Sequence, residues 1–173
     1  MEYVDGKTLQ QWLDDVGRLD LKTVRDLVPQ LVSALRAFHR LDMLHQDLKP
    51  GNIMISRDGV LKIIDFGSTK IAGIADISTP IQRSELLGTK HYTAPEYLLG
   101  RAGQPQSDQF SLACIVYEML TGHLPYGEKL AKVHTRQDLH RIEYQSIALF
   151  IQDMPSWVDK TFPKALQIYP EKR

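Results

Sequence analysis

The segment from His45 to Asn52 brings together side chains whose types suit the transfer of a phosphoryl group. Such a transfer needs a carboxylate that takes the proton of an acceptor hydroxyl, and cations that neutralise charge on the phosphate oxygens. Asp47 could accept the proton, and Lys49 could reach the phosphate that moves. Asn52 follows Asp47 with four residues between them, and it could hold a magnesium ion.

Asp65 opens a second short motif, Asp65-Phe66-Gly67, and could provide a further ligand for magnesium. Taken singly, these residues also have simpler roles. Asp47 could cap a turn, and Lys49 could be a solvated surface charge. Asp65 and Gly67 are common where a strand ends in a turn. The functional interpretation therefore depends on the motifs occurring together.

The order of these motifs along the chain resembles that of protein kinases. The catalytic loop His45–Asn52 comes first, Asp65-Phe66-Gly67 follows, and Ala94-Pro95-Glu96 comes last. The chain is similar to the C-terminal lobe of a eukaryotic-like serine/threonine protein kinase. This resemblance implies an α+β, mainly α-helical, protein kinase-like fold, C-terminal lobe only, with a small β-hairpin at the catalytic site. It also implies ATP and Mg²⁺ as cofactors, and a protein serine or threonine hydroxyl as the acceptor.

The resemblance begins at the first residues of the chain. Met1-Glu2-Tyr3-Val4 is similar to the family's hinge between lobes, which implies that backbone groups of Glu2 and Val4 bind adenine. Met54 falls where the family places an apolar floor under the adenine ring, although a methionine in a strand is by itself more often a core residue. Residues 1–173 are thus expected to be a partial kinase domain, with the hinge and the C-terminal lobe.

Gly88-Thr89 precedes the Ala-Pro-Glu triplet, as it does in serine/threonine kinases. The resemblance implies that the hydroxyl of Thr89 bridges Asp47 and Lys49, and that the enzyme is not a tyrosine kinase. Taken alone, Thr89 would more often be a loop hydroxyl that bonds to nearby backbone. Its catalytic role therefore comes from the resemblance and not from the residue type.

Two further residues are assigned structural roles by the resemblance. Asp108 would anchor the backbone of the catalytic loop, although Asp108 or Ser107 could instead be a simple helix N-cap. Glu96 would form a buried ion pair with Arg173, although a solvated Arg173 at the end of the chain is the competing interpretation.

Gln46 departs from the family's usual pattern, because kinases of this kind commonly carry an arginine there that receives the phosphate of a phosphorylated activation loop. A neutral amide cannot make a charge-assisted bidentate pair with a phosphate. We therefore expect that Ser78, Thr79 and Ser84 need not be phosphorylated for activity through this contact.

A second departure is that the family's glycine-rich loop, strand lysine and partner glutamate have no counterparts in residues 1–173. All of them belong to the N-terminal lobe, so we expect that lobe to come from upstream sequence and the chain alone to bind nucleotide poorly. The C-terminal part, with Pro155–Asp159 and Pro170–Arg173, resembles bacterial kinases that can be joined to a phosphatase domain.

The overall composition limits the other functions of this chain. Its 21 basic and 21 acidic residues balance, so no global positive field favours nucleic acid or anionic lipid. Cys114 is the only cysteine, and no apolar run is long enough to span a bilayer, which predicts a cytoplasmic protein without a membrane segment. A pseudokinase that acts as a docking module and a small-molecule kinase of the aminoglycoside type are the alternatives.

The elements that position these residues can be predicted from apolar periodicity. Apolar residues at helical spacing, ended by Gly17, predict a short helix over residues 8–17. Asp20 can cap a longer amphipathic helix that reaches about Leu41. Pro29 lies inside this helix, which predicts a kink or a helix that becomes regular only after it.

The second half of the chain continues with strands, a loop and helices. Ile53–Ser56 and Val60–Ile64 predict a hairpin, and residues 65–96 read as a long functional loop. A helix that is apolar around most of its circumference should be buried at the centre of the domain and end at Gly122. Further helices are expected near residues 135–151 and 156–168.

Overall fold

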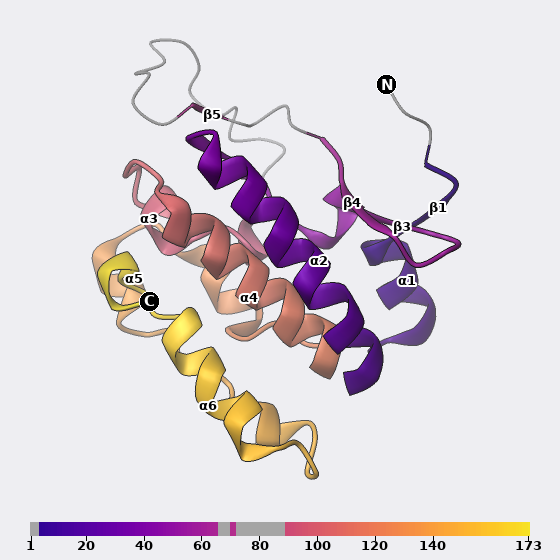
Figure 1. Cartoon of the computed structure of the whole chain (residues 1–173). Helices are drawn as coiled ribbons and strands as arrows, with labels where there is room; N and C mark the ends of the chain where they lie inside the picture. The colour runs from indigo at the N-terminus through magenta and orange to yellow at the C-terminus, as the bar shows by residue number, and fades with distance from the viewer. Residues whose placement is uncertain (1–3, 66–69, 72–88) are drawn as a thin grey trace.

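The computed structural model describes residues 4–65, 70–71 and 89–173. In Figure 1, the long helices labelled α2 and α4 lie side by side, the strands labelled β1, β3 and β4 lie near α1, and β5 lies apart from them. The helices are α1 (Leu9–Val16), α2 (Leu21–Arg40), α3 (Pro95–Leu98), α4 (Pro105–Thr121), α5 (Arg136–Leu139) and α6 (Ser156–Ala165). The strands are β1 (Gly6–Thr8), β2 (Met43–Leu44), β3 (Ile53–Ser56), β4 (Leu61–Ile63) and β5 (Lys70–Ile71). The mainly helical α+β fold expected from the sequence is confirmed.

Helix α1 begins and ends where the sequence predicts. The side chain of Thr8 accepts a hydrogen bond from the backbone N–H of Gln11, and the Gln11 side chain accepts from the N–H of Thr8. This reciprocal cap satisfies donors that a helix start otherwise leaves unpaired. Gly17 ends the helix with a φ of 77°, a conformation that glycine adopts without strain.

Helix α2 is capped by Asp20, whose carboxylate accepts from the N–H of Thr23 at 2.9 Å. Its apolar stripe faces inward and includes the buried residues Leu31 and Leu35. The helix is already regular before Pro29, so the expectation that regularity begins only after this proline is wrong. Packing of the apolar stripe stabilises the helix by more than the loss of one backbone hydrogen bond at proline destabilises it. A kink at Pro29 stays a prediction.

The predicted hairpin is present and belongs to a three-stranded sheet. Strands β3 and β4 pair antiparallel with Ile53 opposite Ile63, and the turn between them contains Gly59 at a φ of 81°. Strand β1 pairs antiparallel with the other side of β3, with Gly6 opposite Ser56, and the sequence reading did not predict it. Strands β2 and β5 form a separate antiparallel pair.

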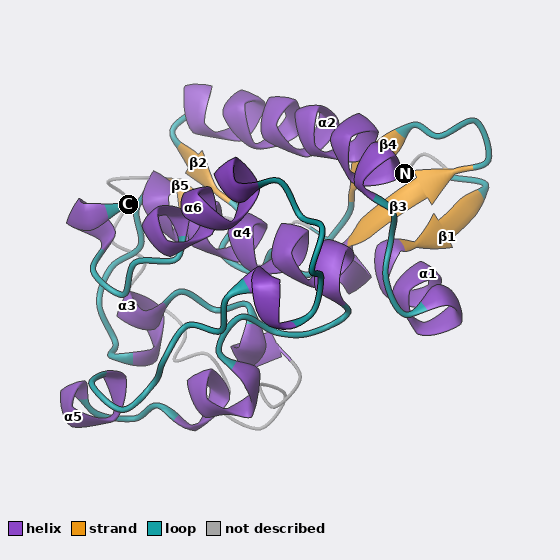
Figure 2. Cartoon of the chain, turned by 90° about the horizontal axis from the view of Figure 1, so that it is seen from below, coloured by secondary structure: helices purple, strands orange, loops and turns teal. Residues whose placement is uncertain are grey.

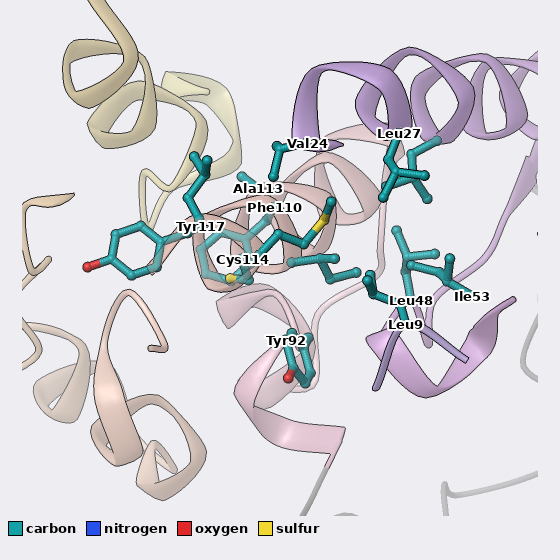
Figure 3. Packing of buried hydrophobic residues seen from close by; sticks show 14 of the residues in the cluster. Leu9, Val24, Leu27, Leu48, Ile53, Tyr92, Phe110, Ala113, Cys114 and Tyr117 are labelled. Carbon is teal, nitrogen blue, oxygen red and sulfur yellow. The ribbon is translucent and has the colours of Figure 1, made fainter. Parts of the chain in front are cut away.

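Helix α4 lies at the centre of the fold, as its nearly continuous apolar sequence predicts. Figure 3 shows Phe110, Cys114 and Tyr117 of this helix inside the core, with Leu27 of α2 and Leu48 of the catalytic loop nearby. Burial of these side chains supplies the main stabilising term of the fold. Gly122 ends the helix in the left-handed conformation, as expected.

The start of α4 differs from one sequence alternative. Gln104 is the N-cap, and Pro105 takes the first helical position. The hydroxyl oxygen of Ser107 accepts a hydrogen bond from the N–H of Gln104 at 3.1 Å, as part of a reciprocal cap. Asp108 therefore lies inside the first turn. The alternative that Asp108 or Ser107 is the N-cap is wrong.

The helix expected near residues 135–151 is also wrong. Only α5 and a short 3₁₀ turn, Ile147–Leu149, form in this segment. Tertiary hydrogen bonds hold the remainder extended: the backbone of Gln145 bonds to Tyr117 and Pro125, and the carboxylate of Asp159 accepts from Tyr144, Ser146 and Ile147. These bonds satisfy backbone groups that a helix would have used internally. Helix α6 forms where residues 156–168 predicted one (Figure 2).

Candidate active site

The catalytic loop connects β2 to β3 and alternates between buried and accessible side chains. Leu48 is 2% exposed and packs in the core. The side chains of its neighbours Asp47 and Lys49 are 18% and 28% exposed. A short 3₁₀ turn, Pro50–Asn52, then leads into β3. The buried Leu48 thus fixes the loop from beneath while its polar neighbours remain accessible.

Asp47, Lys49 and Asn52 meet in this loop, as the sequence predicts. The Nζ atom of Lys49 lies 2.9 Å from Oδ2 of Asp47. The side-chain amide of Asn52 donates to the same oxygen at 3.1 Å and to the backbone carbonyl of Asp47 at 2.9 Å. Among the described residues, the other carboxylate oxygen of Asp47, Oδ1, has no hydrogen-bond partner although it is buried.

The carboxylate of Asp108 holds the backbone of the loop from behind. Its Oδ2 atom accepts from the N–H of His45 at 3.0 Å, and its Oδ1 atom accepts from the N–H of Gln46 at 3.0 Å. Asp108 is only 1% exposed, and Gln46 has a φ of 67°, which is uncommon outside glycine. The expectation that Asp108 anchors the loop backbone is confirmed.

His45 is completely buried beside this anchor. Burial lowers the pKa of its imidazole below the usual value, although the charges of Asp108 and Asp47 oppose this shift. His45 is therefore a neutral side chain of the interior at neutral pH. It supports the loop, and the proton acceptor must be sought elsewhere.

Asp65 lies next to Asn52 because of the pairing of β3 with β4. The N–H of Ile64 donates to the carbonyl of Asn52 at 2.8 Å, and Asp65 is the next residue along the chain. Asp65 is exposed and has a φ of 61°. Its carboxylate and the carbonyl oxygen of the Asn52 side chain are hard oxygen ligands of the kind that Mg²⁺ takes together with substrate phosphates. Residues Phe66 and Gly67 lie outside the described ranges.

The segment that contains α3 is tied to α4 by side chains that the sequence reading missed. The hydroxyl of Tyr92 donates to Glu118 at 2.6 Å, and the hydroxyl of Ser111 donates to the carbonyl of Tyr92 at 2.8 Å. Burial raises the pKa of Glu118, while the bond from Tyr92 opposes this shift. No sequence signal identified this pair, because neither residue belongs to a short motif.

The ion pair expected between Glu96 and Arg173 is present and buried. The guanidinium makes two parallel bonds to the carboxylate, at 2.7 and 2.8 Å, and the two side chains are 2% and 0% exposed. Ser107 donates its hydroxyl to the same carboxylate at 2.6 Å. Burial alone would raise the pKa of Glu96, but the bonds from Arg173 and Ser107 lower it below the usual value. The alternative of a solvated Arg173 is wrong.

Of the remaining predicted binding residues, the structure describes Val4 and Met54 fully and Thr89 only in its backbone. Val4 is half-buried, and Met54 is half-buried on the face of β3 opposite to its buried neighbours Ile53 and Ile55. Glu2 lies outside the described residues. Thr89 begins a short 3₁₀ turn, Thr89–His91, but its side chain is not described. Their roles toward nucleotide stay predictions.

His39 is a residue at this site that the sequence reading did not single out. Its Nε2 atom lies 2.9 Å from Oδ2 of Asp108. A signal was present, because His39 continues the stripe of Leu31 and Leu35 at a spacing of one helical turn. A polar residue on an otherwise apolar inward face needs a buried partner.

Comparison with known proteins gives the same identification. Residues 1–173 match the protein kinase domain family. A probable serine/threonine-protein kinase PknB of Bifidobacterium longum is 41% identical over 168 residues, which covers 96% of this chain and 24% of that protein. The serine/threonine-protein kinase PknB of Mycobacterium leprae is 37% identical over 142 residues, which covers 80% of this chain and 22% of that protein.

The chain spans about a quarter of the length of these curated relatives. Within the described ranges, no helix combines the length and the apolar content that crossing a membrane requires. The match over all residues, together with the catalytic-loop geometry, shows that the chain belongs to the protein kinase domain family, among the eukaryotic-like serine/threonine kinases.

Proposed function

We propose that this chain provides the hinge and C-terminal lobe of a kinase that transfers the γ-phosphate of ATP to a serine or threonine hydroxyl of a protein. The observation that carries the proposal is the meeting of Asp47, Lys49 and Asn52 in one loop. The Oδ2 atom of Asp47 is bonded to Lys49 and Asn52, and the Asp47 side chain is 18% exposed. A carboxylate that is held in this way and is still accessible can receive a hydrogen bond from the acceptor hydroxyl.

In this proposal, each residue of the loop has a distinct task. Asp47 accepts the proton of the acceptor hydroxyl. Lys49 stabilises negative charge on the phosphoryl group, and its contact with Asp47 keeps the ammonium close to the reacting atoms. Asn52 donates its side-chain amide to the same carboxylate oxygen and to the backbone carbonyl of Asp47, which holds the carboxylate in place. The hydroxyl of Thr89 bridges Asp47 and Lys49 when the substrate is aligned.

ATP and Mg²⁺ would bind along the edge formed by the start of the chain and the hairpin. Backbone groups of Glu2 and Val4 would bind adenine, with Met54 under the ring. The oxygens of Asn52 and Asp65 would hold the magnesium ion. When bound, magnesium neutralises charge on the phosphate oxygens and so makes the phosphoryl group easier to attack.

The decisive experiment is Asp47→Asn in the full-length protein, with transfer of labelled γ-phosphate to a protein substrate as the readout. Loss of a general base should lower kcat by about 10²- to 10⁴-fold. Asp58→Asn is the matched control, because Asp58 is an exposed aspartate in the β3–β4 turn and its carboxylate accepts a hydrogen bond from Ser56. The Asp58 variant should keep wild-type activity.

Unchanged phosphorylation by Asp47→Asn would remove Asp47 from its role and would contradict the proposal. Absence of transfer by the wild-type protein, with retained partner binding, would instead identify a pseudokinase. Transfer to an aminoglycoside but not to protein would identify a small-molecule kinase.

A second prediction concerns residues 1–173 on their own. They contain no glycine-rich loop and no strand lysine to cover the phosphates, and positioning supplies most of the catalysis in this reaction class. Titration calorimetry with Mg·ATP should therefore show binding at least about tenfold weaker than for the full-length protein. Equal affinities would show that the N-terminal lobe is dispensable for nucleotide binding.

A further inference from the structure

The last two turns of α2 carry basic side chains that the proposed catalytic machinery does not use. Arg36 and Arg40 lie one helical turn apart, and both are exposed. Together with Ser33 and His39 they line a surface cavity of about 500 Å³. Small-ligand sites commonly enclose about 300–1,000 Å³, so this cavity is large enough for a ligand. Within the described ranges, no residue of the catalytic loop lines it.

The two arginines concentrate positive charge on one side of this cavity. Like charges four residues apart on a helix repel each other. Among the described residues, no carboxylate forms an ion pair with Arg36 or Arg40. The Nε atom of Arg40 donates to the backbone carbonyl of Arg36 at 3.2 Å, which holds the Arg40 guanidinium against the preceding turn. An anion bound in the cavity would relieve the repulsion between the two guanidinium groups.

The position of these arginines near the end of α2 has a simpler explanation in part. The carboxyl end of a helix is its negative end and favours basic side chains in the last turn. That effect accounts for Arg40, which is in the last turn, but it falls off within one turn of the end. It therefore does not explain why Arg36, one turn earlier, shares a cavity with Arg40.

The number of charges in the cavity indicates the class of anion. The described lining residues supply two permanent positive charges, from Arg36 and Arg40. A phosphorylated side chain carries a charge of about −1.5 to −2 at neutral pH, which matches them. Guanidinium groups can each bind two phosphate oxygens, and the hydroxyl of Ser33 can donate to another.

Larger anionic partners fit this cavity less well. Nucleic acid is bound by neutralising many phosphates along a groove, and anionic membranes are recognised by clusters of about four to eight basic residues. The chain has 21 basic and 21 acidic residues, so no surplus of positive charge extends the attraction beyond the cavity. A single phosphate group is therefore the ligand that these side chains match.

We propose that Ser33, Arg36 and Arg40 form a docking site for a phosphorylated serine or threonine side chain of a partner protein. All three side chains are exposed, so a phosphate carried by a polypeptide can approach them. His39 forms a fixed wall of the cavity, because its Nε2 atom is bonded to Asp108 at 2.9 Å. The site binds a partner and carries out no chemistry, so it does not depend on the proposed phosphoryl transfer.

The test measures binding of a fluorescent, glycine-flanked phosphoserine peptide to the full-length protein by anisotropy, with saturating Mg·ADP present to occupy the nucleotide site. The double variant Arg36→Gln with Arg40→Gln should weaken binding by about tenfold or more, because charge-assisted hydrogen bonds to the phosphate are lost. Arg36→Lys with Arg40→Lys should lose less, because the charge is kept and only the paired donors are lost.

The matched control removes the same charge from the other end of α2. Lys22 and Arg25 are exposed and do not line the cavity. Lys22→Gln with Arg25→Gln should keep the affinity for the phosphopeptide within about twofold, because salt screens charges that lie far from the ligand. Thermal unfolding of each variant verifies that it is folded.

Three results would overturn the inference. The first is wild-type affinity in the glutamine variant of Arg36 and Arg40, and the second is an equal loss in the control variant, which would show attraction to overall charge alone. The third is equal affinity for the unphosphorylated peptide, or binding of inorganic phosphate without binding of the phosphopeptide. If Asp47→Asn proved fully active while the phosphopeptide still bound through Arg36 and Arg40, the proposed catalytic role would fail and the docking site would stand.

Discussion

The backbone and the side chain of Gln46 serve different purposes in this loop. Its N–H is bonded to the buried carboxylate of Asp108, so its backbone conformation is set by the interior. Its side chain is a neutral amide at the position where the family commonly carries an arginine. Since an amide lacks the charge that recognises a phosphate dianion, we expect this side chain not to make the regulatory contact, whereas the anchor of the loop is kept.

The prediction at this scale concerns the hydroxyls of the following loop, which lies outside the described residues. The triple variant Ser78→Ala, Thr79→Ala and Ser84→Ala should keep the activity of the full-length protein within about twofold, because no charge-assisted pair with Gln46 is lost. Phosphate transfer to a protein substrate measures this. Loss of activity in the triple variant, with recovery by acidic substitutes, would contradict the prediction.

At the scale of elements, β1 and β3 approach each other so closely that only glycine fits at one position. A Cβ atom at Gly6 would lie 2.1 Å from the backbone carbonyl oxygen of Ile55. Backbone atoms cannot move aside as the end of a side chain can. The pairing that holds the start of the chain against the hairpin therefore depends on Gly6.

We expect Gly6→Ala to destabilise the fold by about 1–3 kcal/mol, the usual range for overpacking, and to separate β1 from β3. Thermal unfolding measures the first effect, and amide exchange at Lys7 and Thr8 measures the second. Gly51→Ala is the control for stability, because within the described ranges no atom beyond its two chain neighbours lies within 4 Å of its added Cβ, and its φ is not positive. Equal midpoints for both variants would refute the close approach.

At the scale of the whole molecule, Glu96 and Arg173 join segments that lie 77 residues apart. The guanidinium also donates to the carbonyls of Gln106, Gln167 and Ile168, and it lies over the ring of Phe110 at 4.8 Å. One side chain thus connects α3, α4 and the segment after α6. Removal of one partner leaves an uncompensated buried charge, which destabilises the fold more than removal of both partners does.

We therefore predict that Arg173→Ala lowers the free energy of unfolding by about 3–5 kcal/mol. The double variant Glu96→Gln with Arg173→Met should recover part of this loss, because no buried charge remains. Arg136→Ala is the matched control, since Arg136 is exposed and makes no ion pair among the described residues. A loss as small as that of the control would show that the pair contributes nothing.

The same pair predicts a dependence of stability on pH. The bonds from Arg173 and Ser107 lower the pKa of Glu96 against the effect of burial, so the folded state binds this proton less readily than the unfolded state. The stabilisation is present above the ordinary carboxyl pKa and is lost as pH falls through the lowered value. The thermal midpoint of the wild type should thus fall more steeply in acid than that of Glu96→Gln. Parallel curves would contradict this assignment.

Much of the site could be predicted because its residues lie close together in the amino-acid sequence. Asp47, Lys49 and Asn52 stand in one loop, and their mutual contacts depend on few intervening bonds. The capped helices α1 and α2 were predicted for a similar reason, since a cap and a periodic stripe are local patterns. The helix expected over residues 135–151 failed because distant groups, among them Asp159, bond to that backbone instead.

The family, the order of the chemical groups and the positions of the main helices could be predicted from the amino-acid sequence, because they follow from local spacing and periodicity. Three features became apparent from the folded structure alone: β1 joins the hairpin, His39 reaches Asp108, and Ser107 shares the carboxylate of Glu96. The physical reason is that hydrogen bonds between distant segments depend on how buried faces pack, and no local pattern of residues records which polar groups that packing brings together.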